Sequence, residues 1–382
     1  MLSKNVGIIG YGSAAYEKKP SKTIFGYLGE AARAAIKSAG ISKQDIDGIT
    51  VDAVNLGSDT AVTTAEYFGL SVSFAYKATH AGAGALISVA NAVRAVESGQ
   101  AKYVLCVGGG AQDVAAFKRR IAQFTMAIQD YLVPHGYGGP PGLFGIIQRK
   151  HMELYGTTRE QFGRVAVDQR LNAQLNDAAL LRGPLSLDDY LNAPLIAEPL
   201  RLYDCVMPCS GAEALVIGPL DRVPKGKGVR VLSAADHHNH PVGEVAPVRG
   251  GWEVFRDKLF NEAGYAHKDM SFMQLYDDFP IMAAIQIEDL GFCKKGEVGA
   301  FFDQHRLTHD GSFPLNTGGG QLSCGQAGGS AGIIGLVEAT RQLRGEGGHR
   351  QVKNAQRGIV SGFGMISYGH GLSSSALIVE KA

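Results

Sequence analysis

Short apolar runs alternate along this chain with longer segments that carry an apolar face. In the first third, residues 6–10, 48–51 and 103–108 are apolar runs of the kind expected for strands covered on both faces. Residues 23–39 keep one face apolar and stop at a glycine, which predicts a helix. Residues 82–96 are small or apolar on nearly all sides, which predicts a buried helix.

The C-terminal part of the chain repeats this order. Apolar runs predict strands at 229–232, 272–276 and 358–362, with a helix at Trp252–Ala263 and a buried helix at about 331–343. A duplicated strand–helix unit of this kind predicts an α/β architecture of five layers, αβαβα, with two stacked sheets.

A local landmark marks the duplication. Gly40 closes the first predicted helix and Asp45 follows it, while Gly264 and Asp269 stand at the same offset after the second. We therefore expect the two halves to pack as one unit rather than as separate beads.

An insertion separates the halves. Residues 1–110 and 202–227 are expected to form the N-terminal half, 228–382 the C-terminal half, and 111–201 an inserted loop and cap subdomain. Within the insertion, residues 143–155 and 158–172 have helix-like amphipathic patterns. An insertion of that size beside strand ends is expected to roof a binding site.

Composition excludes several function classes. The 382 residues are 19% charged with a formal net charge of +1, so neither a nucleic-acid footprint nor an anionic membrane surface is indicated. No apolar run suits a membrane span and no signal peptide opens the chain. Five scattered cysteines favour a reducing, cytoplasmic location.

Metal sites are not predicted. Cys205 and Cys209 have no further Cys or His nearby to complete a zinc site. The adjacent histidines His237, His238 and His240 converge poorly on one ion, so a solvated loop is favoured for them.

The stretch 314–332, PLNTGGGQLSCGQAGGSAG, combines dense glycine with apolar flanks and leads into the apolar run 333–337. Glycine permits close approaches that side chains forbid, so this stretch predicts a buried turn pressed against a ligand or another backbone. A flexible surface loop is the alternative.

Several separated motifs together resemble the thiolase superfamily, particularly its sterol-carrier-protein-type, "lipid-transfer" thiolase-like branch. They are Ser98-Gly99-Gln100-Ala101, the run 199–205 (PLRLYDC), Gly296-Glu297, Leu315-Asn316-Thr317-Gly318-Gly319 and the run 342–346 (QLRGE). The resemblance covers essentially the whole chain. It implies the thiolase fold, a homodimer, and a site for an acyl-coenzyme A (CoA) thioester as substrate, without a further cofactor.

The site departs from the family pattern at three places. A thiolase needs a nucleophilic Cys at the start of the first buried helix, but Gly82 stands there, or His80 if the register shifts by two residues. Gln326 stands where the family has the His of Gly-His-Pro, and Gln cannot titrate. Tyr276 stands where an Asn or His is expected. Acyl-enzyme thiolysis is therefore disfavoured.

A Cys-lacking branch of the family works as aldolases in steroid side-chain degradation, and the resemblance implies retro-aldol cleavage of a β-hydroxyacyl-CoA here. That reaction needs a base and donors for the developing enolate, but no nucleophile. The candidate catalytic residues are Tyr276, Tyr368, Asp277, His80 and His370. The candidate substrate- and CoA-binding residues are Gly82, Gly319, Gly320, Gln326 and Cys324.

Each candidate also has a structural alternative: Tyr276 as a core residue, Asp277 as a helix cap, His80 as a hydrogen-bonded structural His, and Tyr368 and His370 as loop packing. Two other functions stay open. One is a thiolase-type C-acyltransferase, for which Cys324 could supply a substitute nucleophile. The other is a non-catalytic acyl-CoA-binding or scaffold subunit, for which Gly82 and Gln326 would be signs of a lapsed site.

The resemblance also implies a partner, a small zinc-ribbon/OB-fold (DUF35-type) protein that binds the homodimer. The expected roof contains Tyr131, Phe144 and the Gly-Pro-rich run 135–141. These residues suit a bulky steroid-like or aromatic acyl group, and equally a simple hydrophobic lid.

Overall fold

A computed structural model describes residues 2–53, 60–121, 125–367 and 370–382, with backbone only over the part of 365–372 that it covers. One nine-stranded mixed sheet runs through this part of the chain, in the order β3-β2-β4-β7-β1-β8-β11-β10-β9. The strands of the first half are β1 (Val6–Glu17), β2 (Gly48–Ala53), β3 (Phe74–Lys77), β4 (Val104–Gly110) and β7 (Ser210–Pro219). Those of the second half are β8 (Val229–His238), β9 (Phe272–Gln274), β10 (Arg357–Ser367) and β11 (His370–Lys381).

The two halves of the sheet are joined by a narrow contact. We call β3-β2-β4-β7-β1 the N-terminal half-sheet and β8-β11-β10-β9 the C-terminal half-sheet. Strands β1 and β8 pair only at Gly7 with Arg230 and Ile8 with Val229. A Cβ atom on Gly7 would lie 2.2 Å from the Val229 carbonyl oxygen, so glycine is what allows the two backbones to meet. Two separate stacked sheets were predicted. The structure instead has one continuous sheet, whose halves are joined by two pairs of residues.

Two buried helices fill the space between the half-sheets. They are α3 (Gly84–Glu97) and α12 (Ile334–Arg344). Apolar side chains of the helices, such as Val89 of α3 and Leu336 of α12, form one cluster with residues of both half-sheets. Val104 of β4 and Leu377 of β11 are examples from the two half-sheets. The predicted small-residue helices are thus the central layer of the fold.

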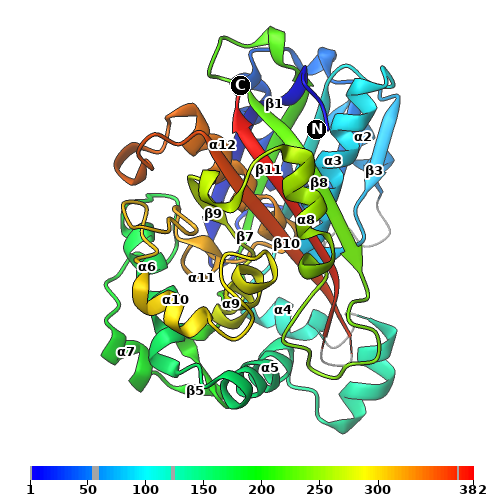
Figure 1. The fold of residues 1–382 in the computed structure, drawn as a ribbon. Coiled ribbons are helices and arrows are strands. Elements are labelled where there is room, and N and C mark those ends of the chain that lie inside the picture. Colours follow the sequence, from blue (N-terminus) through cyan, green and yellow to red (C-terminus); the bar gives the residue numbers. More distant parts are fainter. Residues whose placement is uncertain (1, 54–59, 122–124, 368–369) are drawn as a thin grey trace.

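Helices also cover both outer faces. Helices α1 (Ile24–Ala39) and α2 (Ala61–Phe68) pack on the N-terminal half-sheet. Helices α8 (Trp252–Ala263), α9 (Pro280–Asp289) and α10 (Val298–Gln304) pack on the C-terminal half-sheet, with α8 lying across it in Figure 1. The order of layers is α, β, α, β, α, which confirms the predicted five-layer architecture.

The duplicated landmark has the same geometry in both halves. Gly40 and Gly264 end α1 and α8 in the left-handed conformation, with φ of 67° and 76°. Asp45 then accepts a hydrogen bond from the Ser42 amide at 2.8 Å, and Asp269 accepts one from the Ala266 amide at 2.8 Å. Each buried helix also begins after a 3₁₀ turn, η2 (Ala81–Ala83) before α3 and η8 (Gly328–Gly332) before α12.

The insertion gathers beyond the ends of the strands, at the lower edge of Figure 1. Its helices are α4 (Val114–Ile121), η3 (Ile128–Leu132), η4 (Val133–His135), α5 (Pro140–Tyr155), α6 (Arg159–Gln174) and α7 (Leu187–Asn192), and its hairpin pairs β5 (Leu195–Ala197) with β6 (Leu200–Arg201). The short helices elsewhere are η1 (Lys43–Asp45), η5 (Leu202–Asp204), η6 (Leu220–Arg222), η7 (His267–Asp269), α11 (Gly320–Cys324) and η9 (Gly348–Arg350). In the described ranges, every helix is too short or too polar to cross a bilayer.

Candidate active site

An apolar pocket lies between the insertion and the beginnings of the two buried helices. The insertion contributes its roof: Phe117, Arg120, Ile121, Ile128, Tyr137, Pro140 and Pro141. The floor comes from the two halves of the fold: Gly82, Tyr276, Phe279, Gly328, Gly329 and Phe363. Polar side chains enter at Asp52, Gln112, Asp278 and Gln326. The turns η2 and η8 thus both open onto one pocket.

Tyr276 occupies the space into which residue 82 would project. A Cβ atom on Gly82 would lie 2.1 Å from Cε2 of Tyr276 and 2.4 Å from the Phe363 carbonyl oxygen. Such distances are shorter than real Cβ contacts, so no side chain fits at position 82 while the tyrosine ring is in place. The absence of a cysteine at position 82 and the presence of Tyr276 therefore go together, because the ring occupies the space that the cysteine side chain would need.

The backbone and the hydroxyl of Tyr276 are both held by glutamines. Gln286 on α9 accepts from the Tyr276 amide at 3.1 Å and donates to its carbonyl oxygen at 2.7 Å. Gln326 Nε2 donates to the Tyr276 hydroxyl at 3.4 Å and to Gln321 Oε1 at 3.1 Å. Because Gln326 offers an N–H to the phenol oxygen, the tyrosine proton is left to point elsewhere.

Burial sets the protonation state of Tyr276. Only 8% of this residue is exposed, and burial, followed by the nearby Asp278, Asp52 and Asp277 carboxyls, raises the pKa of Tyr276 well above its usual value. The side chain is therefore a neutral phenol at physiological pH and acts as a hydrogen-bond or proton donor.

Asp52 and Asp278 bring two buried carboxyl groups to the pocket. Burial raises the pKa of Asp52 to about 8, and burial together with Asp277 raises the pKa of Asp278 well above the usual value. Asp52 Oδ2 and Asp278 Oδ1 have no hydrogen-bond partner in the described residues. Buried carboxyls with shifted pKa values and free oxygens in a cleft are typical of functional sites.

Neither carboxyl was among the catalytic residues predicted from the sequence. Asp278 stands beside Tyr276 and Asp277 in the same short motif, and Asp52 follows the predicted strand 48–51. A polar residue directly after a buried strand is the signal that could have identified Asp52, because ligands often bind at strand ends.

Asp277 has a different surrounding from its neighbours. Its two oxygens accept from the amides of Gln321 at 2.9 Å and Leu322 at 3.2 Å, and so cap the start of α11. The expected alternative was a cap for a helix from Phe279 onward, but the helix that Asp277 caps comes from the glycine-rich stretch. Burial raises the pKa of Asp277 to about 7, against the effect of these amide hydrogen bonds.

Gly319 and Gly320 shape this cap. Both have positive φ, 104° and 59°, and a Cβ atom on Gly320 would lie 2.1 Å from Asp277 Oδ2. Glycine is therefore needed where the turn passes the carboxylate. Among the residues proposed for substrate binding, Gly82 and Gln326 line the apolar pocket, whereas Gly320 lines a second, inner cavity.

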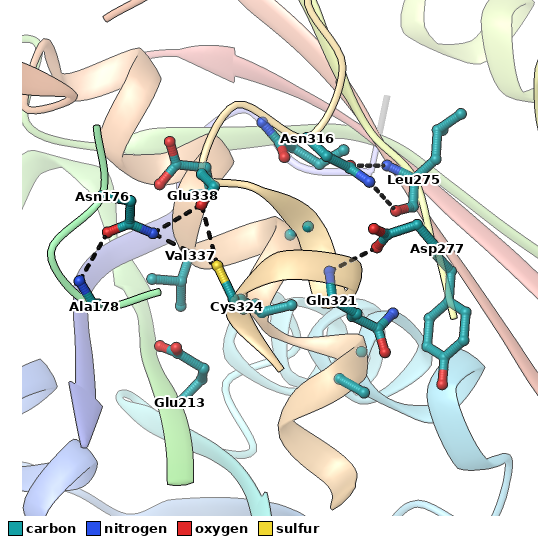
Figure 2. Close-up of a pocket in the computed structure, with 18 of the residues that line it drawn as sticks. Asn176, Ala178, Glu213, Leu275, Asp277, Asn316, Gln321, Cys324, Val337 and Glu338 are labelled. Atoms are coloured by element: carbon teal, nitrogen blue, oxygen red, sulfur yellow. Dashed lines mark hydrogen bonds between the residues drawn. The ribbon is translucent and has the colours of Figure 1, made fainter. Parts of the chain in front are cut away.

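That inner cavity contains Cys324 and is shown in Figure 2. The Cys324 thiol donates to the Gly318 carbonyl oxygen at 3.1 Å and accepts from Asn176 Nδ2 at 3.6 Å, pointing away from Asp277. Burial raises the pKa of the Cys324 thiol far above its usual range. A thiol that stays protonated is a poor nucleophile.

Cys205 is the cysteine that lines the apolar pocket itself. Burial, with Asp204 and Asp278, raises the pKa of Cys205 to about 12, so this thiol also stays protonated. The described part of the pocket therefore offers no activated thiol.

The other catalytic candidates, His80, His370 and Tyr368, lie outside the apolar pocket or outside the described residues. The His80 ring stacks on His238 at a centroid distance of 5.0 Å, and burial, followed by His238, lowers the pKa of His80. Within the described residues, His80 is not among those that line the apolar pocket. Tyr368 and the side chain of His370 lie outside the described residues, so both stay predictions.

Two histidines near the end of β8 lie against separate carboxylates. His238 Nε2 lies 3.0 Å from Asp236 Oδ2, and His240 Nε2 lies 2.8 Å from Glu253 Oε1. Over the described ranges, no group of His, Cys, Asp and Glu is arranged to hold a metal ion.

Comparisons with known proteins are consistent along the whole chain. Residues 247–379 match the family model "Thiolase C-terminal domain-like". The chain is 31% identical to 17-hydroxy-3-oxo-4-pregnene-20-carboxyl-CoA lyase of Mycobacterium tuberculosis, over 90% of this chain and 93% of the lyase. It is 29% identical to an acetyl-CoA acetyltransferase of Methanothermobacter thermautotrophicus, over 94% and 96%. A solved structure, "Ltp2-ChsH2(DUF35) aldolase", superposes with a TM-score of 0.85 at 28% identity, covering 100% of this chain and 99% of that one.

Proposed function

The chain belongs to the thiolase superfamily, in the branch of steroid side-chain aldolases and sterol-carrier-protein-type thiolase-like proteins, and from this we propose that it is a CoA-thioester lyase. The reaction is retro-aldol cleavage of a β-hydroxyacyl-CoA, which releases a ketone or aldehyde and a shortened thioester. The apolar roof, with Phe117, Ile121 and Ile128, suits a bulky acyl group.

One observation carries this proposal: the Tyr276 ring fills the space of the missing residue-82 side chain. A thiolase needs a thiolate there and a base beside it, whereas this pocket has a neutral phenol, and the amide of Gln326 donates to its oxygen. Retro-aldol cleavage needs no nucleophile, so the same residues suit it.

The different pKa values of Asp52, Asp278 and Tyr276 indicate a different role for each group in the reaction. Asp52, with a pKa of about 8, is ionised in a useful fraction of molecules and takes the proton of the β-hydroxyl. The bond between the α and β carbons then breaks, the β carbon becomes a carbonyl, and the electron pair moves into the thioester as an enolate. Tyr276 donates to the enolate oxygen, and the proton that Asp52 has taken up passes to the α carbon, which completes the shortened thioester and restores the Asp52 carboxylate. The raised pKa of Asp278 favours its protonated form. Backbone amides of η2 and η8 are the further donors that we assign to the enolate oxygen.

The direct test is turnover of β-hydroxyacyl-CoA thioesters whose β carbon is a tertiary alcohol, followed by mass spectrometry of both products and of the intact protein. We expect a shortened thioester and a ketone, with the protein mass unchanged. A stable acyl adduct on Cys205 or Cys324 would instead establish a C-acyltransferase. This is the second candidate function, because one relative is an acetyl-CoA acetyltransferase. Tight thioester binding without turnover would establish a scaffold subunit.

We expect kcat/KM to increase with pH up to a plateau. Asp52 must be ionised to accept the proton, and its pKa is raised to about 8, so kcat/KM should increase about tenfold per pH unit below that value and level off above it. Asp52→Asn should remove this dependence along with most of the activity. Glu213→Gln, a buried carboxyl of the inner cavity whose pKa burial raises to about 7, is the control that should keep it. A flat profile in the wild-type protein would contradict the assignment of Asp52.

We propose a protein partner because the name of the similar aldolase, Ltp2-ChsH2(DUF35), includes a DUF35 protein. The chain alone should form a homodimer with low activity, and co-expression with a small zinc-ribbon/OB-fold protein should give an active assembly of two copies of each. Sedimentation velocity on the chain, the partner and the mixture would measure this. A fully active lone dimer whose mass does not change on mixing would contradict it.

The five free cysteines support a cytoplasmic location for this assembly.

A further inference from the structure

One cation on the roof of the apolar pocket forms no ion pair with any residue that the structure describes. Arg120 lies on α4, and its guanidinium carbon is 5.7 Å from the centroid of the Phe117 ring. Its Nη1 atom is buried and has no hydrogen-bond partner in the described residues, nor does any carboxylate there form an ion pair with this side chain. Arg120 as a whole is half-buried, and a charge that is partly withdrawn from water in this way is costly unless something pairs with it.

A second polar side chain in the same pocket is also without a partner. Gln112 is only 1% exposed, and both atoms of its side-chain amide lack a hydrogen bond in the part of the chain that the structure describes. Its backbone is fixed, because its amide donates to Ser210 Oγ at 2.8 Å and its carbonyl oxygen accepts from the same hydroxyl at 2.9 Å. The backbone of Gln112 is thus held in place, while no described residue satisfies its side-chain amide.

The cation comes from another part of the fold than the proposed catalytic groups. Arg120 belongs to the insertion, whereas Tyr276, Asp52 and Asp278 belong to the two halves of the fold, and all four line the same pocket. Among the described residues, no ion pair joins Arg120 to either carboxyl. Ile121, Ile128 and Pro140, which line the roof with Arg120, are apolar.

We infer that the acyl group of the substrate carries a carboxylate remote from the thioester, and that Arg120 binds this carboxylate with the help of the Gln112 amide. The inference rests on the proposed function in one respect, that the apolar pocket holds the acyl group. A guanidinium donates two parallel hydrogen bonds to a carboxylate, and an apolar surrounding strengthens them. The same cation could bind a phosphate of CoA, so the test must separate the two sources.

The experiment measures binding rather than turnover, by isothermal titration of the full chain with thioesters that have no β-hydroxyl. Adipyl-CoA and suberyl-CoA are compared with hexanoyl-CoA and octanoyl-CoA, which have the same chain lengths without the carboxylate, and with free CoA. We expect at least one dicarboxylic thioester to bind about 10- to 100-fold more tightly than its uncharged match. Arg120→Met should abolish that difference and leave the affinity for free CoA unchanged.

Two further variants complete the design. Arg119→Met removes an exposed cation from the next position of α4 and should keep the preference. Gln112→Leu should reduce it severalfold. Equal binding of charged and uncharged thioesters by the wild-type protein would overturn the inference, and so would a loss of affinity for every thioester and for CoA in Arg120→Met, which would identify a phosphate site. Because none of these ligands can be cleaved, the preference can fail while the lyase activity holds, and the reverse.

Discussion

Tyr276→Phe is expected to lower kcat for C–C cleavage about 10²- to 10⁴-fold, the range of a lost general acid–base group, with little change in thioester affinity. The variant keeps the ring that fills the space beside Gly82 and keeps the two backbone hydrogen bonds to Gln286. It removes only the hydroxyl to which Gln326 donates. The effect should therefore fall on the chemical step, measured by single-turnover kinetics with a β-hydroxyacyl-CoA.

Tyr67→Phe is the matched control for this change, because Tyr67 is 64% exposed on α2 and is not among the described residues that line the pocket. Its kinetics should equal those of the wild type. If Tyr276→Phe retained more than about a third of wild-type kcat, Tyr276 would be a core residue that only shapes the pocket, and Tyr368 would become the leading candidate among the tyrosines.

Gly82→Ala is expected to reduce both activity and stability. The added methyl group would lie 2.1 Å from the Tyr276 ring and 2.4 Å from a backbone carbonyl oxygen, so the ring must move from its position. Overpacking of this kind costs about 1–3 kcal/mol of the free energy of unfolding. A displacement of about 1 Å in a reacting group can cost 10²-fold in rate, and kcat should fall at least that much.

Gly142→Ala provides the control for the second prediction. A Cβ atom on Gly142, in α5, would meet nothing within 4 Å, so this variant should be as stable as the wild type or slightly more stable. Thermal unfolding of both variants, with the kinetics, measures the difference. A fully active Gly82→Ala protein would show that the Tyr276 ring is free to move and that the pocket has room for a side chain at position 82.

The layers and the duplication could be predicted from sequence because they depend on local signals. The helix-stop glycines Gly40 and Gly264, and the aspartates that follow them, specify their surroundings within a few residues. The same holds for the buried helices, although their first residues form 3₁₀ turns rather than α-helix. The long central strand β7 (Ser210–Pro219) was not predicted, and β1 extends well beyond its apolar first residues.

The site was less predictable because side-chain direction depends on contacts between distant segments. Tyr276, Asp277 and Asp278 are adjacent in sequence, yet Tyr276 and Asp278 line the pocket while Asp277 accepts from the amides of α11, more than forty residues later. Asp52 reaches the same pocket from the other half of the fold. A free carboxyl oxygen and a capped one look the same in a sequence, since the difference lies in which backbone amides come near.

The place of β1 in the sheet, between β7 and β8, has a consequence for how the protein is made. Strand β1 has its neighbours β7 and β8 more than 190 residues later, so it has no strand to pair with until the ribosome has produced residues 210–230. At about 5–20 residues per second, that interval lasts on the order of 10–40 s. During this time an apolar strand with unpaired backbone groups is exposed, which is the condition that favours aggregation. Expression yield should therefore respond strongly to temperature and to chaperones that bind nascent chains, even in variants whose folded state is as stable as the wild type.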